Sequence, residues 1–250
     1  MQRIVIKIGS SSIVNHDAKY LFTERMESIA EDISWLRKDL KHEVILMSSG
    51  ALAWGRVCMA ASGIEYKHQE NLQMAGACGQ IGIAAAWASA FRKHSLVIGQ
   101  LLLDHENSSS TIVRDTIIKM QGCGMIPYIN ENIPTMEHYD NDALAAEVAC
   151  QTGCDTLILL SDVDGVYSAN PKTDSNAYLI PQIDDIDEAL IKYAEKSSTN
   201  LGTGGMISKL KAAKTMSEIG VKTIIASGEC LNPLREIINA QGGTTIRAKT

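Results

Sequence analysis

Two lysines lie beside glycine-containing loops near opposite ends of the chain, and both could bind phosphate. Lys209 follows the segment 202–208, in which three glycines precede a run of helix-forming residues. Glycines let backbone amides approach an anion, and the start of a helix adds partial positive charge. Lys7 lies in the apolar run 4–8, directly before a loop of small residues. Taken alone, each lysine also fits a structural role, at the surface or at a sheet edge.

Two further polar segments follow predicted strands. Ser48-Ser49-Gly50-Ala51 comes after the apolar run 44–47 and is a second candidate anion site, although an ordinary loop would look much the same. Asp140-Asn141-Asp142 precedes a helical pattern at 143–150. Asp and Asn are favoured helix caps, but one cap does not need three such residues. We therefore expect the triplet to take part in the site.

Several well-known catalytic motifs are absent from the sequence, and their absence argues against the corresponding classes of enzyme. The sequence has no Walker pattern around Lys209, no GxGxxG after the first strand and no G-x-S-x-G. A phosphoryl transferase of another kind remains, in which catalysis is largely positioning and charge neutralisation. A carboxylate acceptor, with a pKa of about 4.3, needs no general base. Its difficulty is charge repulsion, which two lysines would relieve while a carboxylate such as Asp142 holds them in place.

Strand patterns alternate with helical patterns along the whole chain. Strands are predicted at 3–8, 44–47, 96–103, 125–129, 156–160, 222–226 and 244–247, and helices at 23–40, 71–91, 143–150, 184–196, 210–219 and after Pro233. This order predicts an α/β fold with a mostly parallel sheet between helices, whose ligands bind at the carboxyl ends of the strands. The helix at 71–91 is rich in Ala and Gly, which favours close helix packing or a subunit contact.

Composition excludes several other classes of protein. The chain has 250 residues and a net charge of -6, with no basic stripe for nucleic acid. The sequence predicts no apolar run of membrane-spanning length, and the first residues lead straight into a strand, so we expect neither a membrane protein nor a signal peptide. Six cysteines without a CxxC pair indicate reduced thiols in a cytosolic protein, and the scattered histidines indicate no metal site.

The chain resembles the amino-acid kinase family. The motifs that carry the resemblance occur in family order over nearly the whole length: Lys7-Ile8-Gly9-Ser10, Ser48-Ser49-Gly50-Ala51, Ile129-Asn130-Glu131-Asn132, Asp140-Asn141-Asp142, Ser161-Asp162 with Gly165-Val166-Tyr167, and Gly202-Thr203-Gly204-Gly205-Met206 with Lys209. The resemblance implies a three-layer α/β/α sandwich. It also implies ATP-dependent phosphorylation of the γ-carboxylate of L-glutamate, the first step of proline biosynthesis, in a cytoplasmic homodimer or homotetramer.

The resemblance also assigns roles to residues. Lys7 and Lys209 would bracket the transferring phosphoryl group, with Asp142 orienting them. The substrate would meet Ser49, Gly50, Asn130, Asp140 and Asn141. The nucleotide would meet Lys7, Gly9, Ser161, Asp162, Thr203, Gly204, Gly205, Met206, Ile207, Ser208 and Lys209. Mg²⁺ would be held mainly by the nucleotide phosphates, without a dedicated protein ligand.

The sequence departs from the family pattern in two places. After Asn132 the family usually has an aspartate that contacts substrate, whereas this chain has Ile133 and a shorter loop; Glu137 is a candidate replacement. Many members carry a C-terminal PUA domain, and we expect residues 1–250 to form a single kinase domain without one. A kinase for another small acid, such as acetylglutamate or carbamate, and a nucleotide sensor that has lost catalysis remain as alternatives.

Overall fold

A single mixed sheet forms the centre of the described chain. The computed structural model describes residues 1–15, 17, 19–65, 71–135, 140–171, 173–188, 190–191, 205–240 and 242–249. The strands are β1 (Arg3–Ile8), β2 (Val14–Asn15), β3 (Tyr20–Leu21), β4 (Glu43–Ser48), β5 (Ile98–Leu103), β6 (Ile126–Glu131), β7 (Thr156–Ser161), β8 (Gln182–Ile183), β9 (Lys222–Ser227) and β10 (Thr244–Ile246). The helices are α1 (Thr23–Lys38), α2 (Ala51–Ala61), α3 (Leu72–Arg92), α4 (Thr111–Gly122), α5 (Asn141–Thr152), α7 (Met206–Glu218) and α8 (Pro233–Ala240), with 3₁₀ turns η1 (Ser10–Ser12) and η2 (Ile133–Thr135).

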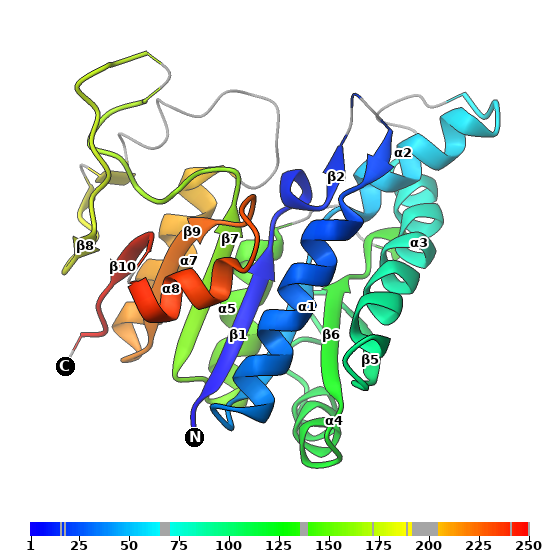
Figure 1. Cartoon of the computed structure of the whole chain (residues 1–250), viewed down its shortest axis with the longest axis horizontal. Coiled ribbons are helices and arrows are strands. Elements are labelled where there is room, and N and C mark those ends of the chain that lie inside the picture. Colours follow the sequence, from blue (N-terminus) through cyan, green and yellow to red (C-terminus); the bar gives the residue numbers. More distant parts are fainter. Residues whose placement is uncertain are drawn as a thin grey trace.

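The first strand of the sequence is central in the sheet. The strand order is β5-β6-β4-β1-β7-β9-β10-β8, and β1 pairs in parallel with both β4 and β7. A strand covered on both faces needs an apolar sequence, and the run Ile4–Ile8 is almost entirely buried. The carboxyl ends of β1, β4, β6 and β7 lie at the same edge of the sheet, the upper edge in Figure 1.

Helices cover both faces of the sheet. Alternate residues of β1 point to opposite sides, so Ile4, Ile6 and Ile8 pack in one apolar cluster with α1, α3 and α8, whereas Val5 packs in another with α4, α5 and α7. Figure 1 shows α1 and α8 in front of the sheet and α5 behind it. The three-layer α/β/α sandwich predicted from the sequence is therefore confirmed.

Glycines join α2 tightly to α3. A Cβ atom at Gly55 would lie 1.7 Å from the carbonyl oxygen of Ala75, and one at Gly79 would lie 1.8 Å from that of Ala51. Such distances leave no room for any side chain at either position. Of the two uses predicted for the small residues of this helix, close packing within the chain is the one observed.

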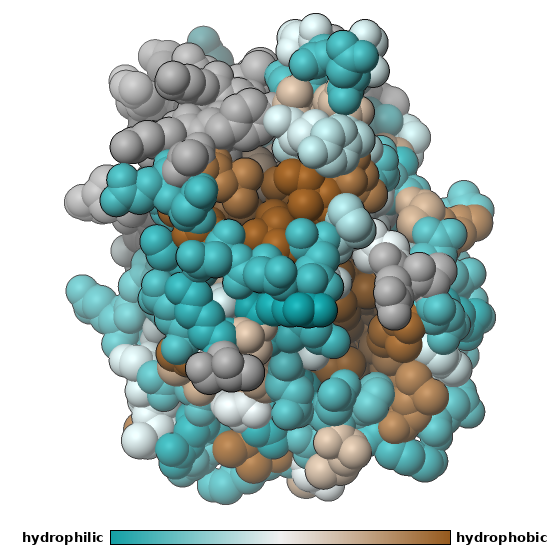
Figure 2. Space-filling model, turned by 90° about the vertical axis from the view of Figure 1, so that its left-hand side faces the viewer, coloured by the Kyte–Doolittle hydropathy of each residue, from teal (hydrophilic) through white to brown (hydrophobic). Residues whose placement is uncertain are grey.

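The β8 edge of the sheet is short and polar. β10 runs antiparallel to β9, and β8 consists of only two residues, which limits pairing with other strands. Ion pairs lie beside it, Arg247 with Asp184 at 3.3 Å and Lys249 with Asp185 at 2.9 Å. Figure 2 shows this side of the molecule, where hydrophilic residues surround an apolar area.

The sequence prediction about apolar length needs correction for α3. Among the described residues, this helix is long and apolar enough to cross a membrane by length and composition alone. Its Trp87 and Phe91 are fully buried in the core, however, and the helix packs against α1 and α2. Core helices pass the same test, so this feature is weak support for a membrane span.

Other differences from the predicted elements are local. The sequence patterns missed α4, the hairpin of β2 and β3, and the short strand β8. Helix α7 begins at Met206, which places Lys209 about one turn into the helix as expected, and α5 begins at Asn141 instead of 143. Most of the helix predicted at 184–196 lies outside the described residues.

Candidate active site

Two buried lysines meet on one buried carboxylate at the carboxyl edge of the sheet. Lys7, the fifth residue of β1, places Nζ 2.7 Å from Oδ1 of Asp142 in the first turn of α5. Lys209, in the first turn of α7, places Nζ 3.1 Å from Oδ2 of the same carboxylate. The lysines are each 3% exposed and Asp142 is 0% exposed. The structure thus brings together the three residues that the sequence predicted at the site of phosphoryl transfer.

The charges of this cluster depend on one another. Burial raises the pKa of Asp142, but the ammonium groups of Lys7 and Lys209 outweigh burial and leave the pKa below its ordinary value. Burial also lowers the pKa of Lys209; the Asp142 carboxylate opposes this change and Lys7 adds to it. Two positive charges against one negative charge leave the cluster with an excess positive charge, which favours an anion.

Asp140 connects the start of α5 to the start of α7. Its Oδ1 accepts hydrogen bonds from the amides of Asp142 and Ala143, at 3.0 and 3.1 Å, so it is the N-cap of α5. The same oxygen accepts a hydrogen bond from Oγ of Ser208 at 2.6 Å. The capping role that the sequence allowed for the triplet therefore belongs to Asp140, while Asp142 binds the lysines.

Two helices begin with a glycine and without a side-chain cap. Gly50 precedes α2 with φ of +104°, a conformation that L side chains rarely adopt, and Gly205 precedes α7 in an extended conformation. Neither N-terminus has a side-chain cap hydrogen bond. Their first amides are available to an anion, unlike those of α5, which Asp140 caps.

A buried network of amide side chains extends from α3 to α5. Nδ2 of Asn130 donates to Oε1 of Gln80 at 3.2 Å, and Nδ2 of Asn141 lies 3.4 Å from Oδ1 of Asn130. Gln80 also donates to the carbonyl oxygen of Glu131 at 2.8 Å. The predicted substrate residues Asn130 and Asn141 are therefore in contact, close to the cap at Asp140.

The remaining predicted residues lie around this centre. Ser161 ends β7, and its Oγ donates to Oδ1 of Asp162 at 3.0 Å. Burial lowers the pKa of Lys209, and the charge of Asp162 is near enough to oppose part of this lowering. The amide of Gly9 donates to the carbonyl of Leu160 at 2.9 Å, and the amide of Ser49 donates to that of Ile8 at 2.9 Å. Both amides are used in the sheet, so neither is the one that a phosphate would meet.

Some predicted positions lie outside the described residues, namely Thr203, Gly204 and Glu137. Ile133, at the position where the resemblance led us to expect an aspartate, lies in η2 and is 3% exposed. A Cβ atom at Gly76 of α3 would lie 2.4 Å from its Cγ2, so Ile133 packs closely against α3.

The sequence analysis assigned no role to Glu131. This last residue of β6 is 3% exposed, and burial raises its pKa to about 7. One feature of the sequence could have drawn attention to it: Glu131 is an acidic residue that directly follows residues 126–130 of a strand, which the structure shows to be buried. An ionisable group with such a shift beside the lysine cluster is a candidate for function.

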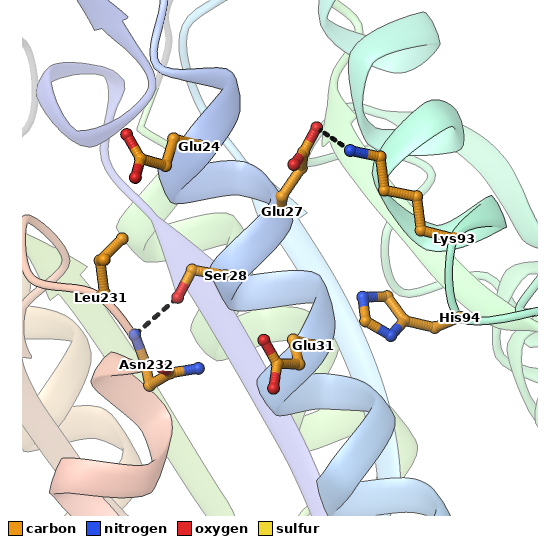
Figure 3. A pocket seen from close by; sticks show the side chains of 8 residues that line it. All are labelled: Glu24, Glu27, Ser28, Glu31, Lys93, His94, Leu231 and Asn232. Carbon is orange, nitrogen blue, oxygen red and sulfur yellow. Dashed lines mark hydrogen bonds and ion pairs between the residues drawn. The ribbon is translucent and has the colours of Figure 1, made fainter.

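A shallow groove of about 330 Å³ lies elsewhere, along the outer side of α1 (Figure 3). Its lining comes from α1, the end of α3 and the segment before α8: Glu24, Glu27, Ser28, Glu31, Lys93, His94, Leu231 and Asn232. Two of its acidic groups are paired, Glu27 with Lys93 at 2.5 Å and Glu31 with Arg235 at 3.2 Å. None of the residues of the lysine cluster lines this groove, so it is not the candidate site.

Proteins of similar sequence share nearly the whole of this chain. A glutamate 5-kinase of Agrobacterium fabrum is 40% identical over 99% of this chain and 67% of its own length. A glutamate 5-kinase of Roseobacter denitrificans is 38% identical over 99% of this chain and 68% of its own length. The chain therefore spans about two thirds of the length of these relatives.

Solved structures agree on the fold. Carbamate kinase from Giardia lamblia bound to AMP-PNP superposes with a TM-score of 0.72 at 16% identity, over 99% of each chain. An isopentenyl phosphate kinase gives a TM-score of 0.70 at 19% identity, over 98% of this chain and 99% of its own. The family model described as "Amino acid kinase family" matches residues 2–227. The chain belongs to the amino acid kinase family.

Proposed function

We propose that this protein transfers the γ-phosphoryl group of ATP to the γ-carboxylate of L-glutamate, giving L-glutamyl 5-phosphate and ADP, the first step of proline biosynthesis. The observation that carries the proposal is the meeting of Lys7 and Lys209 on Asp142 at the carboxyl edge of the sheet. Relatives that are about 40% identical over nearly the whole chain are glutamate 5-kinases, which supports glutamate as the acceptor over other small acids.

The reaction needs no group to remove a proton from the acceptor. An oxygen of the ionised γ-carboxylate attacks the γ-phosphorus of ATP, and the bond from that phosphorus to the β,γ-bridging oxygen breaks, so ADP leaves with the bond electrons. Negative charge moves across the transferring group during this step. Lys7 and Lys209 offset that charge, and Asp142 fixes the two ammonium groups before the substrates arrive.

The two uncapped helix N-termini fit the two substrates. The start of α7 at Gly205, directly before Lys209, suits the nucleotide phosphates, and the start of α2 at Gly50 suits a carboxylate of the acceptor. Asn130 and Asn141 supply further polar contacts to the acceptor, with Asp140 positioning the helix that carries Asn141. Closure of the site would exclude water, which hydrolyses acyl phosphates.

Mg²⁺ would be held by the nucleotide phosphates and would neutralise part of their charge. The Asp142 carboxylate is bound by Lys7 and Lys209, so we propose that it orients these lysines and does not bind the metal. Use of ATP makes the cytoplasm the expected compartment, and small molecules the expected partners, without nucleic acid or membrane.

A homodimer or homotetramer is part of the proposal. The outward side of α3 carries Met74, 54% exposed, and Ile81, 75% exposed, which is consistent with a contact between copies. Light scattering of the purified protein measures this directly, and a monomer at micromolar concentration would contradict it.

An acceptor panel tests the proposed reaction. Purified protein is given Mg-ATP with L-glutamate, N-acetyl-L-glutamate or carbamate; ADP release is followed, and hydroxylamine traps the acyl phosphate. We expect ADP and hydroxamate with L-glutamate and neither with N-acetyl-L-glutamate. The Lys209→Ala variant is the control for contaminating kinases. Turnover of acetylglutamate or carbamate but not glutamate would overturn the choice of acceptor, and nucleotide binding without turnover of any acid would indicate a sensor.

A further inference from the structure

Glu131 has a buried carboxylate oxygen without a hydrogen-bond partner. Its Oε1 is inaccessible to solvent and no described residue donates to it. Burying a polar atom in this way costs about 1–3 kcal/mol, so an unsatisfied group needs an explanation. A ligand that donates a hydrogen bond is one such explanation.

The other carboxylates of the site are already used. Asp142 binds both lysines, and Asp140 accepts from two amides of α5 and from Ser208. Glu131 also holds the amide of Asp140, because that amide donates to its carboxylate, but only one of its oxygens is needed for this bond. Among the described carboxylates of the site, Glu131 is the one with a buried oxygen that has neither a hydrogen bond nor an ion pair.

A second unpartnered acceptor lies in the same network. Oδ1 of Asn141 is also buried, and no described residue donates to it. Its Nδ2 lies 3.4 Å from Oδ1 of Asn130, the neighbour of Glu131, and its backbone directly follows Asp140. One charged and one neutral acceptor together favour a ligand that is a cation with several donors, which describes an ammonium group.

The apolar residue Ile133, close to Glu131 in the sequence, fits this picture. Ile133 is apolar and packs against Gly76 of α3, so position 133 supplies no carboxylate to the acceptor site. Glu131 is two residues earlier, at the end of β6, beside Lys7 and Asp140. A carboxylate is thus present in this part of the site, although at a different position in the sequence.

We propose that Glu131, together with Oδ1 of Asn141, binds the α-ammonium group of the amino-acid acceptor and thereby selects acceptors with a free primary amine. This inference rests on the proposed function. It makes Glu131 a specificity-determining residue, since the ammonium group is remote from the γ-carboxylate that reacts.

The rival explanation is that Glu131 only anchors α5 through the amide of Asp140. Glu131→Gln separates the two explanations, because glutamine keeps the size and an oxygen for that amide but loses the negative charge. Glu131→Asp keeps the charge on a shorter side chain. Glu147→Gln is the matched control. Glu147 lies in α5, the helix that Asp140 caps, but its side chain is half-exposed and is bound to His105 and Ser108.

The measurement compares L-glutamate with glutarate, which has both carboxylates but no ammonium group. For Glu131→Gln we expect the KM for L-glutamate to rise about 10- to 100-fold, the range for losing a hydrogen bond to a charged group. We expect kcat to change less than about threefold and the inhibition constant of glutarate, competing with L-glutamate, to change less than about twofold. Glu131→Asp should recover part of the KM, and Glu147→Gln should leave all three constants unchanged.

A pH profile of the unaltered protein tests the same idea without any variant. The groups that act on Glu131 are Lys7 on β1, Asp140 before α5 and His105 after β5. Burial raises the pKa of Glu131 to about 7, so protonation below that pH removes the charge that would bind the ammonium group. We expect the KM for L-glutamate to rise as the pH falls below about 7, while inhibition by glutarate stays constant.

The outcomes separate this inference from the proposed function. If Glu131→Gln raises the KM for L-glutamate and the inhibition constant of glutarate by the same factor, Glu131 acts only by anchoring α5, although glutamate is still the substrate. If the variant does not fold, equal pH dependence for the two ligands in the unaltered protein overturns the inference. If the unaltered protein does not phosphorylate L-glutamate at all, the proposed function has failed.

Discussion

Ser208 donates a hydrogen bond of 2.6 Å to Asp140, and this bond joins the first turn of α7 to the cap of α5. The two helices carry Lys209 and Asp142, so the bond fixes the distance between groups that themselves form an ion pair. It also connects the proposed nucleotide side of the site to the proposed acceptor side.

We expect Ser208→Ala to lower the free energy of unfolding by about 1–2 kcal/mol, because a hydrogen bond to a charged, partly buried group is lost. Urea denaturation of Ser208→Ala, Asp140→Ala and the double variant forms a double-mutant cycle. A coupling energy above about 0.5 kcal/mol is expected for residues in direct contact. Strict additivity would show that the two side chains do not interact in solution.

Replacing either lysine should abolish most turnover while the protein still folds. In Lys209→Ala the carboxylate of Asp142 keeps Lys7 as its partner, and in Lys7→Ala it keeps Lys209. We expect kcat to fall roughly 10²-fold or more, as when one preorganised donor is lost. Circular dichroism monitors the fold. Unchanged turnover in either variant would contradict the assigned role, and Lys211→Ala, at an exposed position of α7, is the control.

Asp142→Asn should destabilise the protein strongly, because two buried ammonium groups would then face each other without a counter-charge. Breaking a buried pair costs about 3–5 kcal/mol. The pKa of Asp142 is lowered in the folded state, so its contribution is present above the ordinary pKa of 3.8 and is lost as the pH falls below that value. Urea denaturation at pH 7 and across the acid range below pH 4 measures both effects.

Asp185→Asn provides the matched control for that experiment. Asp185 also pairs with a lysine, Lys249 at 2.9 Å, but both side chains are exposed to solvent. Surface pairs of this kind contribute little. A loss of stability as large in Asp185→Asn as in Asp142→Asn would show that burial of the cluster is not the cause.

Gly79→Ala should disturb the packing of α2 on α3. The new methyl group would lie 1.8 Å from the carbonyl oxygen of Ala51, so the helices must separate. Overpacking of this kind costs about 1–3 kcal/mol or more, which a thermal melt would detect. Gly122→Ala is the control, because a Cβ atom there meets nothing within 4 Å. Equal melting temperatures for Gly79→Ala and the unaltered protein would contradict the close contact.

The strands and the acidic triplet were predictable because each has a strong local pattern. The run Ile4–Ile8 is apolar enough to indicate a buried strand, and Lys7 stands out in it as a charge that needs a partner. The sequence analysis named Asp142 as that partner, and the structure places the two groups 2.7 Å apart. The pairing depends on the sheet order, which puts β1 beside β7 and under α5, and that order is not a local property.

Other features were missed or had no local signal. The missed helix α4 has an apolar pattern as periodic as that of α1, so its signal was present in the sequence. The role of Gly55 depends on a neighbour twenty residues away, Ala75. In the sequence Glu131 lies between two asparagines of a family motif. The neighbouring residues do not indicate that its Oε1 is buried without a hydrogen-bond donor. The capping function of Asp140 was predictable, whereas its bond to Ser208 depends on how α5 packs against α7.

The position of β1 in the middle of the sheet has a consequence for synthesis of the protein. Lys7 leaves the ribosome early, whereas Lys209 follows 202 positions later (209 minus 7), and β1 has to wait for β7 before both of its edges are paired. A nascent chain therefore cannot assemble the lysine pair until α7 has emerged. Translation that stops before this point should yield fragments that transfer no phosphoryl group, because they lack Lys209.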